Sequence, residues 1–347
     1  MTKRYLGNII TQNPTAPAGP YQDSAASGVW SLAEALAYNK AGLWPTAGSL
    51  GPTGLFAGGY IAVGSTNEIS YINIASTGDA SDWGDLTVAG NPQTGGAASS
   101  TRAIFGAGAS RRQTYDYITF ATQGNALDFG DTTTGPSGGI SESGLSNSTR
   151  GVWGGVQDSI NRIEYLTIAS IGNALDFGDL SVSRTATASA ASTTRGIWSG
   201  GNANGPFSNV IDYVSIASTG NATDFGDLTQ NVAQLGGASN STRAISGGGW
   251  SDSTSKEATI TYITIASTGN ATDFGDLTTG RNDVAAVASG ERVVFQGGGG
   301  FGNGNAARRL LDYITISTTG NAVDFGEQST EKYASGSASN VHGGIAA

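Results

Sequence analysis

The chain has no cysteine and only one histidine, His342, among its 347 residues. Without cysteine it forms no disulfide and offers no thiolate metal ligand or cysteine nucleophile. A single imidazole excludes histidine-rich zinc sites and argues against a Ser-His-Asp triad. We therefore expect a protein that is not an enzyme, with no catalytic residue, no metal site and no cofactor.

Charged residues and long apolar runs are also scarce. Charged residues make up 13% of the chain, about half of the ~25% in an average soluble protein. Lys and Arg number 17 against 27 Asp and Glu, so the basic face that nucleic-acid binding needs is not expected. No stretch approaches the ~18 consecutive apolar residues of a membrane helix. The apolar run near the start is too short for a secretory signal, and we expect a soluble chain without membrane insertion.

Glycine is abundant, with 54 residues, and much of it falls in an internal repeat. Six segments resemble YITIASTGNATDFGDL, and successive first tyrosines lie 46, 48, 48, 49 and 51 residues apart. A period of ~40–50 residues with short β-type segments is typical of propeller blades. The six segments begin at Tyr71, Tyr117, Tyr165, Tyr213, Tyr262 and Tyr313.

Each repeat contains four segments that alternate like strands and are separated by turn residues. We therefore predict an all-β fold, a β-propeller of four-stranded antiparallel blades over residues 51–347. The strand of small residues should lie at the crowded axis. The C-terminal Lys332–Ala347 resembles the first two strands of a further unit, so it either closes a six-bladed ring or forms a seventh blade with N-terminal strands such as Tyr5–Ile10. We favour six. In the fourth unit the four segments are Thr185–Ser192, Arg195–Gly201, Val210–Ser218 and Ala222–Leu228.

The recurring residues are interpreted as structural. The tyrosines and the phenylalanines or tryptophan twelve positions later should fill the space between blades. One arginine per unit should join an ion-pair or hydrogen-bond ladder with repeat carboxylates, and His342 falls close to this arginine register. The first Asp of each D-F-G-D should cap the T-G-N turn or accept backbone N–H groups. Calcium binding remains an alternative, although the spacing of a calcium loop is missing.

Insertions gather at one point of each unit, in the connection after the glycine doublet. Loops of variable length lie on one face of a repeat protein and often bind partners. Aromatic and arginine side chains are favoured as anchors of interfaces. The candidate contacts are Arg111, Arg112, Phe207, Trp250 and Phe301.

The first 50 residues lack the repeat and are predicted to form an N-terminal arm. Ser31 to Glu34 match a capping box, and Gly42 provides a stop, so a short helix is expected over about 32–41. The arm either caps the first blade or docks the propeller onto a larger assembly, and we favour docking. Its candidate anchoring residues are Tyr5, Leu6, Ile9, Trp30, Leu32, Leu36, Leu43 and Trp44.

Two resemblances follow from these motifs. The strand order of a unit, with its glycine doublet and its Tyr and Phe/Trp positions, is similar to the kelch repeat over residues 51–347. The phrases YITIASTGNATDFGDL, TRG-apolar-aromatic-GG and YLGNII…SGVWSL…LWPTAG resemble structural proteins of marine tailed bacteriophages, cyanophages among them. The second resemblance implies a component of the virion exterior: a tail-fibre, tail-associated or capsid-decorating protein present in several copies.

The leading hypothesis is a non-enzymatic virion protein that is anchored by its arm and displays a propeller. Its expected partners are other virion structural proteins and a host-surface glycan or protein. Two alternatives remain: a propeller enzyme that degrades glycans, since carboxylates are plentiful, and a cellular kelch-type scaffold that binds a protein. Catalytic acids should be unique to one blade, whereas most acids here repeat; Asp252, Glu257 and Asp283 are off-repeat.

Overall fold

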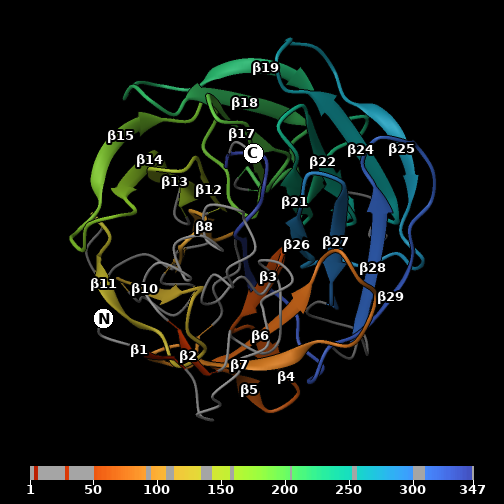
Figure 1. Ribbon diagram of the computed structural model, residues 1–347. Helices are drawn as coiled ribbons and strands as arrows, with labels where there is room; N and C mark the ends of the chain where they lie inside the picture. Colours follow the sequence, from red (N-terminus) through yellow and green to blue (C-terminus); the bar gives the residue numbers. More distant parts are fainter. Residues whose placement is uncertain are drawn as a thin grey trace. The chain divides into compact units, whose positions relative to one another are not determined.

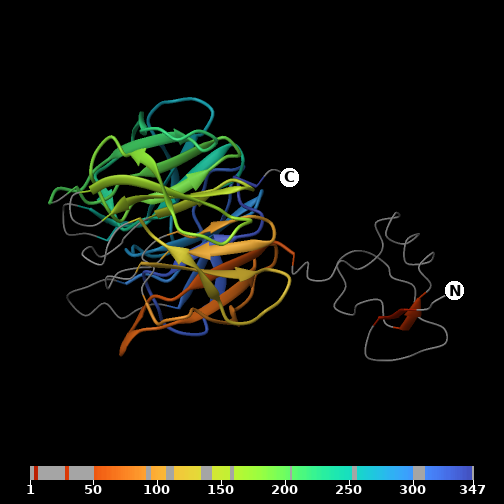
Figure 2. The same cartoon turned by 90° about the vertical axis from the view of Figure 1, so that its left-hand side faces the viewer.

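The computed structural model describes residues 4–6, 28–30, 51–90, 95–106, 113–133, 143–156, 160–203, 205–251, 256–299 and 309–345. The chain divides into two units, Met1–Gly51 with Phe120–Thr122, and Pro52–Thr119 with Gln123–Ala347. In the first unit, β1 (Arg4–Leu6) and β2 (Gly28–Trp30) form an antiparallel pair in which Tyr5 faces Val29 (Figure 2). The helix expected at 32–41 lies outside the described residues.

The second unit is a six-bladed β-propeller, and each blade is a four-stranded antiparallel sheet (Figure 1). From the axis outwards, blade 1 contains β30 (Gly336–Ser339), β3 (Thr53–Ala57), β6 (Glu68–Asn73) and β7 (Ser81–Asp85). Blade 2 contains β8 (Ala97–Ala98), β9 (Arg102–Phe105), β10 (Thr114–Thr119) and β11 (Leu127–Asp131). Blade 3 contains β12 (Ser143–Ser146), β13 (Arg150–Val156), β14 (Ile160–Thr167) and β15 (Leu175–Asp179).

The remaining three blades follow the same order. Blade 4 contains β16 (Ala188–Ala191), β17 (Arg195–Ser199), β18 (Val210–Ser215) and β19 (Thr223–Asp227). Blade 5 contains β21 (Gly236–Ser239), β22 (Arg243–Gly247), β24 (Thr259–Thr264) and β25 (Thr272–Asp276). Blade 6 contains β26 (Ala285–Ala288), β27 (Arg292–Gln296), β28 (Leu310–Thr315) and β29 (Val323–Glu327). Two short pairs lie outside the blades, β4 (Tyr60–Ile61) with β5 (Gly64–Ser65) and β20 (Val232–Ala233) with β23 (Trp250–Ser251).

The predicted all-β propeller and its four strands per blade are confirmed. Among the described residues there is no helix, and thus none long and apolar enough to span a membrane.

The ring is closed by strands from the two ends of this unit. β30 pairs with β3, with Ala338 opposite Leu55 and Ser337 opposite Phe56. The C-terminal segment therefore completes blade 1, which confirms six blades over the seven-bladed alternative. It contributes only its first expected strand, because β3 already holds the second place in that blade.

The innermost strands consist mainly of Gly, Ala and Ser and pack against one another around the axis, as predicted. A Cβ atom built at Gly237 in blade 5 would lie 2.6 Å from the backbone N and O of Ser189 in blade 4. The Ser239 side chain of blade 5 hydrogen-bonds both backbone groups of Ala191, at 2.9 Å from N and 2.7 Å from O. Small residues are needed here because neighbouring backbones approach within direct contact.

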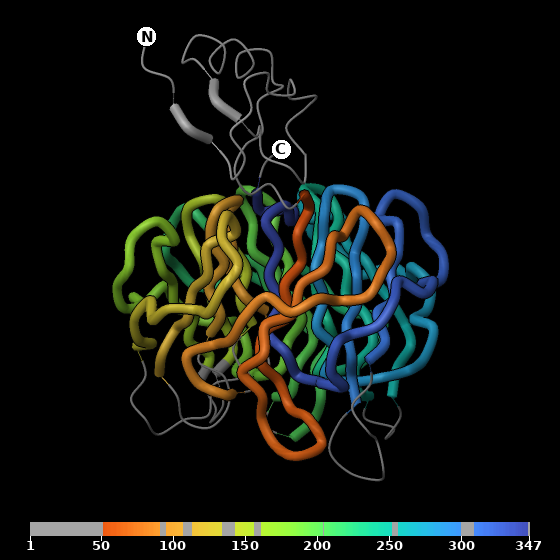
Figure 3. The backbone as a smooth tube through the Cα atoms, turned by 60° about the horizontal axis from the view of Figure 1, so that its bottom comes forward, coloured from red at the N-terminus to blue at the C-terminus, as the bar shows by residue number. Residues whose placement is uncertain are grey.

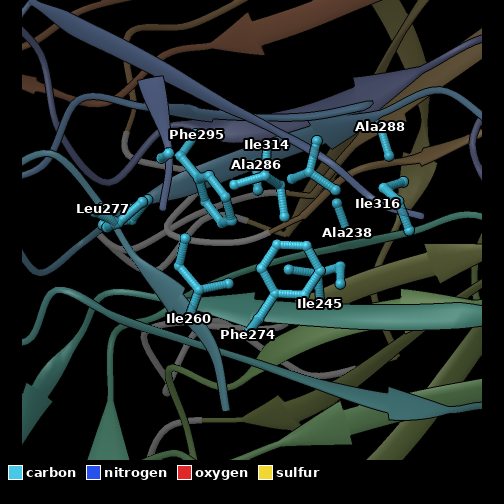
Figure 4. Close-up of a cluster of buried hydrophobic side chains, with 13 residues drawn as sticks. Ala238, Ile245, Ile260, Phe274, Leu277, Ala286, Ala288, Phe295, Ile314 and Ile316 are labelled. Atoms are coloured by element: carbon cyan, nitrogen blue, oxygen red, sulfur yellow. The ribbon is translucent and has the colours of Figure 1, made fainter. Parts of the chain in front are cut away.

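The apolar core lies between the blades. Figure 4 shows the cluster between blades 5 and 6, where Phe274 and Ile245 face Ala286, Phe295 and Ile314. Each fully buried side chain of this size contributes about 1.5–3 kcal/mol. The recurring tyrosine packs edge-on against the recurring aromatic of its own blade, at 5.9 Å between ring centroids for Tyr262 and Phe274. The prediction that these rings are core residues is confirmed.

The outer rim is joined by backbone hydrogen bonds from each blade to the next. In the turn after β18, Gly220 and Ala222 donate to the carbonyls of Phe177 and Asp179 in blade 3, both at 2.7 Å. The side chain of Asn221 accepts from the backbone N–H of Asp179 at 3.1 Å. The Asn of the T-G-N turn thus links the blades. Equivalent bonds occur at all six junctions. The first Asp of D-F-G-D in blade 2, Asp128, accepts the backbone N–H of Gly130 at 3.1 Å, as predicted for this position.

Candidate interaction face

The ring has two faces that differ in their connections. The turn face carries the short turns from first to second and from third to fourth strand, for example 192–194 and 216–222 in blade 4. The loop face carries the second-to-third loops, such as 200–209, and the connections between blades, such as 180–187. In Figure 3 the start of β3 and the C-terminal segment lie on the turn face, and the β4–β5 hairpin extends from the loop face.

Two of the five predicted contact residues lie among the described residues, and both are on the loop face. Phe207 is half-buried in the loop of blade 4 and forms an isolated bridge with Asn202. Trp250 is half-buried in β23 of the blade 5 loop. The other three, Arg111, Arg112 and Phe301, lie outside the described residues.

Phe207 and Trp250 belong to loops that flank the same connection. Val232 donates its backbone N–H to Ser208 at 3.2 Å and accepts one from Gly201 at 2.8 Å. The following Ala233 pairs with Trp250. The connection between blades 4 and 5 therefore binds the loops of both blades and holds them in one continuous surface.

A second aromatic pair on this face was missed by the sequence interpretation. Tyr60 of β4 and Tyr333 of the final connection have ring centroids 5.5 Å apart and pair through their backbones. Burial, followed by the charge of Asp283, raises the pKa of the Tyr333 hydroxyl. The signal was available in the sequence, because neither tyrosine falls in the register of the six repeated ones.

Asp283 is a buried carboxylate at the end of the propeller axis that lies on the loop face. Asp283 adopts a left-handed backbone conformation with φ of 55° and is 6% exposed. It lines a cavity of about 10 Å³, together with Gln234 and Ala334. Burial raises the pKa of Asp283 to about 7, against a smaller opposing effect of Lys256. At neutral pH this side chain is therefore close to half-protonated.

The amide of Asn282 supports this carboxylate. Its Nδ2 donates to Asp283 Oδ2 at 3.1 Å and to Gln234 Oε1 at 2.9 Å. The cavity beside Asp283 has room for about one water molecule. A sugar or drug-sized ligand needs ~300 Å³ or more, so the one off-repeat acid found at the axis borders no substrate-sized pocket.

Buried ion pairs stabilise the connections on the loop face. Arg184, in the connection before blade 4, lies 3.0 Å from Asp212 of β18, and both side chains are fully buried. Arg281 and Asp312 form the equivalent pair before blade 6, at 2.8 Å. The sequence interpretation missed these acids, although four units carry Asp or Glu directly before the repeated tyrosine.

The residues at the positions of this buried ion pair differ at other junctions between blades. Before blade 5 the two positions hold Val232 and Thr261, so cation and acid are absent together. Before blade 1, the fully buried Lys332 lies 3.8 Å from Glu68. Burial lowers the pKa of Lys332 to about 8, although the charge of Glu68 opposes this. The loop face therefore varies from junction to junction in its chemistry as well as in its loop lengths.

On the turn face, the C-terminal segment closes the axis. The innermost strands of five blades, together with Gly95 and Gly96 just before β8, surround a cavity of about 50 Å³, and His342 lines it. His342 Nε2 lies 3.1 Å from Ser146 Oγ and 3.1 Å from the carbonyl of Ala98, while Gly343 donates to the Ser239 carbonyl at 2.9 Å. Burial lowers the pKa of His342 to about 4. The side chain thus joins blades 2 and 3 at the axis instead of following the repeated arginines.

The repeated arginines are structural, but their partners differ from those expected. Arg150 stacks on Tyr165 of its own blade, with Cζ 4.4 Å from the ring centroid. Its Nη1 donates to the carbonyl of Ile216 in the next blade at 2.8 Å. The predicted ladder with repeat carboxylates is therefore wrong. A backbone carbonyl at the end of the neighbouring strand lies within reach, and the aromatic face supplies the second contact.

The anchoring candidates can be placed only in part. Tyr5 and Leu6 lie in β1 and Trp30 lies in β2, on paired strands. The other five lie outside the described residues: Ile9, Leu32, Leu36, Leu43 and Trp44.

Neither chemistry nor similarity singles out an activity. In the described part of the chain, no group of three or more His, Cys, Asp or Glu side chains is arranged to hold a metal ion. In comparisons with known proteins, no family model and no curated protein matches the chain. The fold that the structure shows, a β-propeller, is consistent with a role in protein interaction.

Proposed function

We propose that this chain is a non-enzymatic structural protein on the exterior of a bacteriophage particle. Residues 1–50 anchor it to other virion proteins, and the loop face of its propeller contacts a further protein or a host-surface glycan. The resemblance of its repeat phrases to marine phage structural proteins supports the virion setting. The division of the ring into a regular turn face and a variable loop face supports the interaction role.

The interaction role is supported chiefly by one observation: the repeated polar residues bind neighbouring blades to each other. The turn asparagines and the arginines link one blade to the next and are committed to the ring. The loops that differ in length present half-buried aromatic residues, Phe207 and Trp250, on one surface. Partner recognition is thereby separated from the contacts that maintain the fold.

Mass spectrometry of gradient-purified particles tests the virion setting. We expect peptides of this chain in fixed proportion to the capsid proteins. Deletion of residues 1–45 should remove the protein from particles while the purified variant keeps the unfolding transition of the full chain. Particles that contain the truncated protein at the normal level would contradict anchoring by the arm, and particles without the full chain would contradict the virion role itself.

The loop face is tested with the same particles. The double variant Phe207→Ala and Trp250→Ala should be incorporated normally, because the arm proposed to anchor the protein is unchanged and both side chains belong to the loop face of the propeller. It should reduce adhesion of the purified full chain to susceptible cells by tenfold or more, since aromatic anchors contribute about 1–3 kcal/mol each. Incubation of the full chain with host envelope provides the enzymatic control: released sugars would overturn the non-enzymatic assignment.

A further inference from the structure

Residues 341–345 follow the last strand, β30, and cross the axis of the propeller at the turn face; we call them the axial latch. Gly343 donates its backbone N–H to the Ser239 carbonyl of blade 5 at 2.9 Å. A Cβ atom built at Gly344 would overlap the Ser146 carbonyl of blade 3. The latch therefore fits the narrow axis only because it has glycine where it meets the backbones of the ring.

His342 holds the latch in place, and its hydrogen bonds determine its protonation state. Nδ1 accepts the backbone N–H of Gly344 at 3.1 Å. Nε2 lies 3.1 Å from the carbonyl oxygen of Ala98 in blade 2. Because a carbonyl only accepts, Nε2 carries the proton and the imidazole is neutral. One ring nitrogen thus binds the latch itself, and the other binds the wall of the axis.

The ring does not need this imidazole for its own contacts. Ser146 Oγ, 3.1 Å from His342 Nε2, accepts the N–H of Ala98 at 2.8 Å and donates to its carbonyl at 2.9 Å. In blade 5, Ser239 makes the same two bonds to Ala191 at 2.9 and 2.7 Å. Since His342 is the only histidine of the chain, the second pair of strands is joined without one. The imidazole therefore serves the latch rather than the junction between blades.

A second proton on the imidazole would break the latch from within. It can only be added at Nδ1, which would then face the N–H of Gly344 as donor to donor. Among the described residues that line the axial cavity there is no Asp, Glu, Lys or Arg, so no carboxylate is present to compensate an imidazolium. The arginines that follow the adjoining inner strands, Arg102, Arg150 and Arg243, stack on tyrosines and donate to carbonyls of neighbouring blades.

We propose that the axial latch is a pH-sensitive closure, shut at neutral pH and released in acid when a proton is added to Nδ1 of His342. Release opens the turn-face end of the axial cavity. It leaves the six blades joined, because β30 ends at Ser339, before the latch begins. This inference goes beyond the proposed function and does not depend on the virion setting.

Thermodynamic linkage gives the size of the effect. Burial lowers the pKa of His342 to about 4, with a smaller opposing effect of the bond to the Ala98 carbonyl, whereas a released imidazole has a pKa of ~6.5. The latched form is therefore favoured above pH 6.5 and loses this advantage as the pH falls to about 4. The ratio of released to latched chains should rise about 20-fold from pH 7 to pH 5, and on the order of 100-fold from pH 7 to pH 4.

Nuclear magnetic resonance of the purified full chain tests this closure. The chain has a single histidine, so its imidazole signal is identified directly and should titrate below pH 5. The protection of the Gly343 and Gly344 amides against hydrogen exchange, corrected for the intrinsic rate, should fall about 20-fold from pH 7 to pH 5. The Gly220 amide, which is bonded to the Phe177 carbonyl at the rim, should keep its protection over this range.

Two variants separate the latch from general acid unfolding. His342→Gln keeps a donor and an acceptor but takes up no proton in this range, so the protection of Gly343 should no longer depend on pH. Gly344→Ala should hold the latch open at pH 7 and return the pKa of His342 to ~6.5. Gly290→Ala is its control, because a Cβ atom in that turn meets no atom within 4 Å, and it should change neither quantity.

Three results would overturn the proposal. The first is constant protection of Gly343 and Gly344 in the unaltered chain from pH 7 to pH 4. The second is an equal loss of protection at Gly220, which would mean that acid unfolds the whole ring. The third is a pKa of His342 that stays near 4 in Gly344→Ala, because the imidazole would then be buried independently of the latch. If His342→Gln does not close the latch, Gly344→Ala still decides between these outcomes.

Discussion

The turn face and the loop face stabilise the same six junctions in different ways. At the rim of the turn face, every junction uses two backbone hydrogen bonds and one bond to a turn side chain, with nearly equal lengths. On the loop face, one junction uses Arg184 and Asp212, the next Val232 and Thr261, and another Arg281 and Asp312. Regular backbone contacts fix the ring on one side, which leaves the residues of the other side free to vary between blades.

The largest expected effect comes from disturbing the regular rim. Gly178 has φ of 147°, and a Cβ atom there would lie 2.5 Å from the backbone carbonyl of Gly220 in the next blade. Gly64, in the loop-face hairpin, has φ of 133° and no atom within 4 Å of such a Cβ. Gly178→Ala should therefore lower the free energy of unfolding by on the order of 4 kcal/mol, and Gly64→Ala by about 1–2 kcal/mol from backbone strain alone.

Urea denaturation of both variants measures this difference. Because both glycines have positive φ, both variants lose stability through backbone strain. The difference between their losses in free energy of unfolding therefore measures the contact between blades. Equal losses in the two variants would show that the rim contact contributes little to ring stability.

Breaking a buried pair on the loop face should have the next largest effect. Asp212→Thr leaves the guanidinium of Arg184 buried without its carboxylate and should cost about 3–5 kcal/mol. The junction before blade 5 provides the control, since it uses Val232 and Thr261 at the same two positions. The double variant Arg184→Val with Asp212→Thr should therefore recover to within about 1–2 kcal/mol of the unaltered chain. Urea unfolding of Arg184→Val, Asp212→Thr and the double variant tests this coupling, and additive losses would contradict it.

The two faces also differ in what the sequence could predict. The period, the Tyr–Phe hairpins and the small inner strands follow from local pattern, and the structure confirms them as blades, core rings and axis strands. The partners of Asp212 and the repeated arginines could not be predicted in this way, because they lie across blade junctions and depend on the register of neighbouring sheets. Phe207 and Trp250 were predicted as contacts from loop length and residue type, and the structure places both on the loop face. Asp283 was recognised only as off-repeat, since its burial arises from the closing of the ring.

The next largest effect on stability is expected at Asp283, at the loop-face end of the axis, and it depends on pH. The folded-state pKa of Asp283, about 7, lies above the value of ~3.9 for an exposed carboxyl. The native state therefore holds this proton more tightly, and the contribution of Asp283 to stability falls as the pH rises from about 4 to about 7. Asp283→Asn removes the charge, and asparagine tolerates positive φ. The variant should match the unaltered chain near pH 4 and exceed its free energy of unfolding by on the order of 2–4 kcal/mol above pH 7.

Thermal and urea unfolding across pH 4–8 would measure this difference. Asp312→Asn is the matched control, because that carboxylate lies in an ion pair with Arg281 and its loss should destabilise the ring at pH 8. A constant offset between Asp283→Asn and the unaltered chain over the whole pH range would contradict a raised pKa for Asp283.

The smallest effect is expected at the opposite end of the axis, where the sign is reversed. The pKa of His342 is about 4 in the folded chain, below the ~6.5 of an exposed imidazole. The native state holds this proton less tightly, so the contribution of His342 is present above pH 6.5 and is lost as the pH falls to about 4. His342→Gln should remove this dependence, and because His342 is partly exposed the relative gain at pH 4 should be only on the order of 1–2 kcal/mol. Between pH 4 and pH 6.5 the effects of Asp283 and His342 oppose each other, so the unaltered chain should show a flatter profile than either variant. If the free energy of unfolding changed with pH in the same direction in Asp283→Asn and His342→Gln, the opposite pKa shifts of Asp283 and His342 would be contradicted.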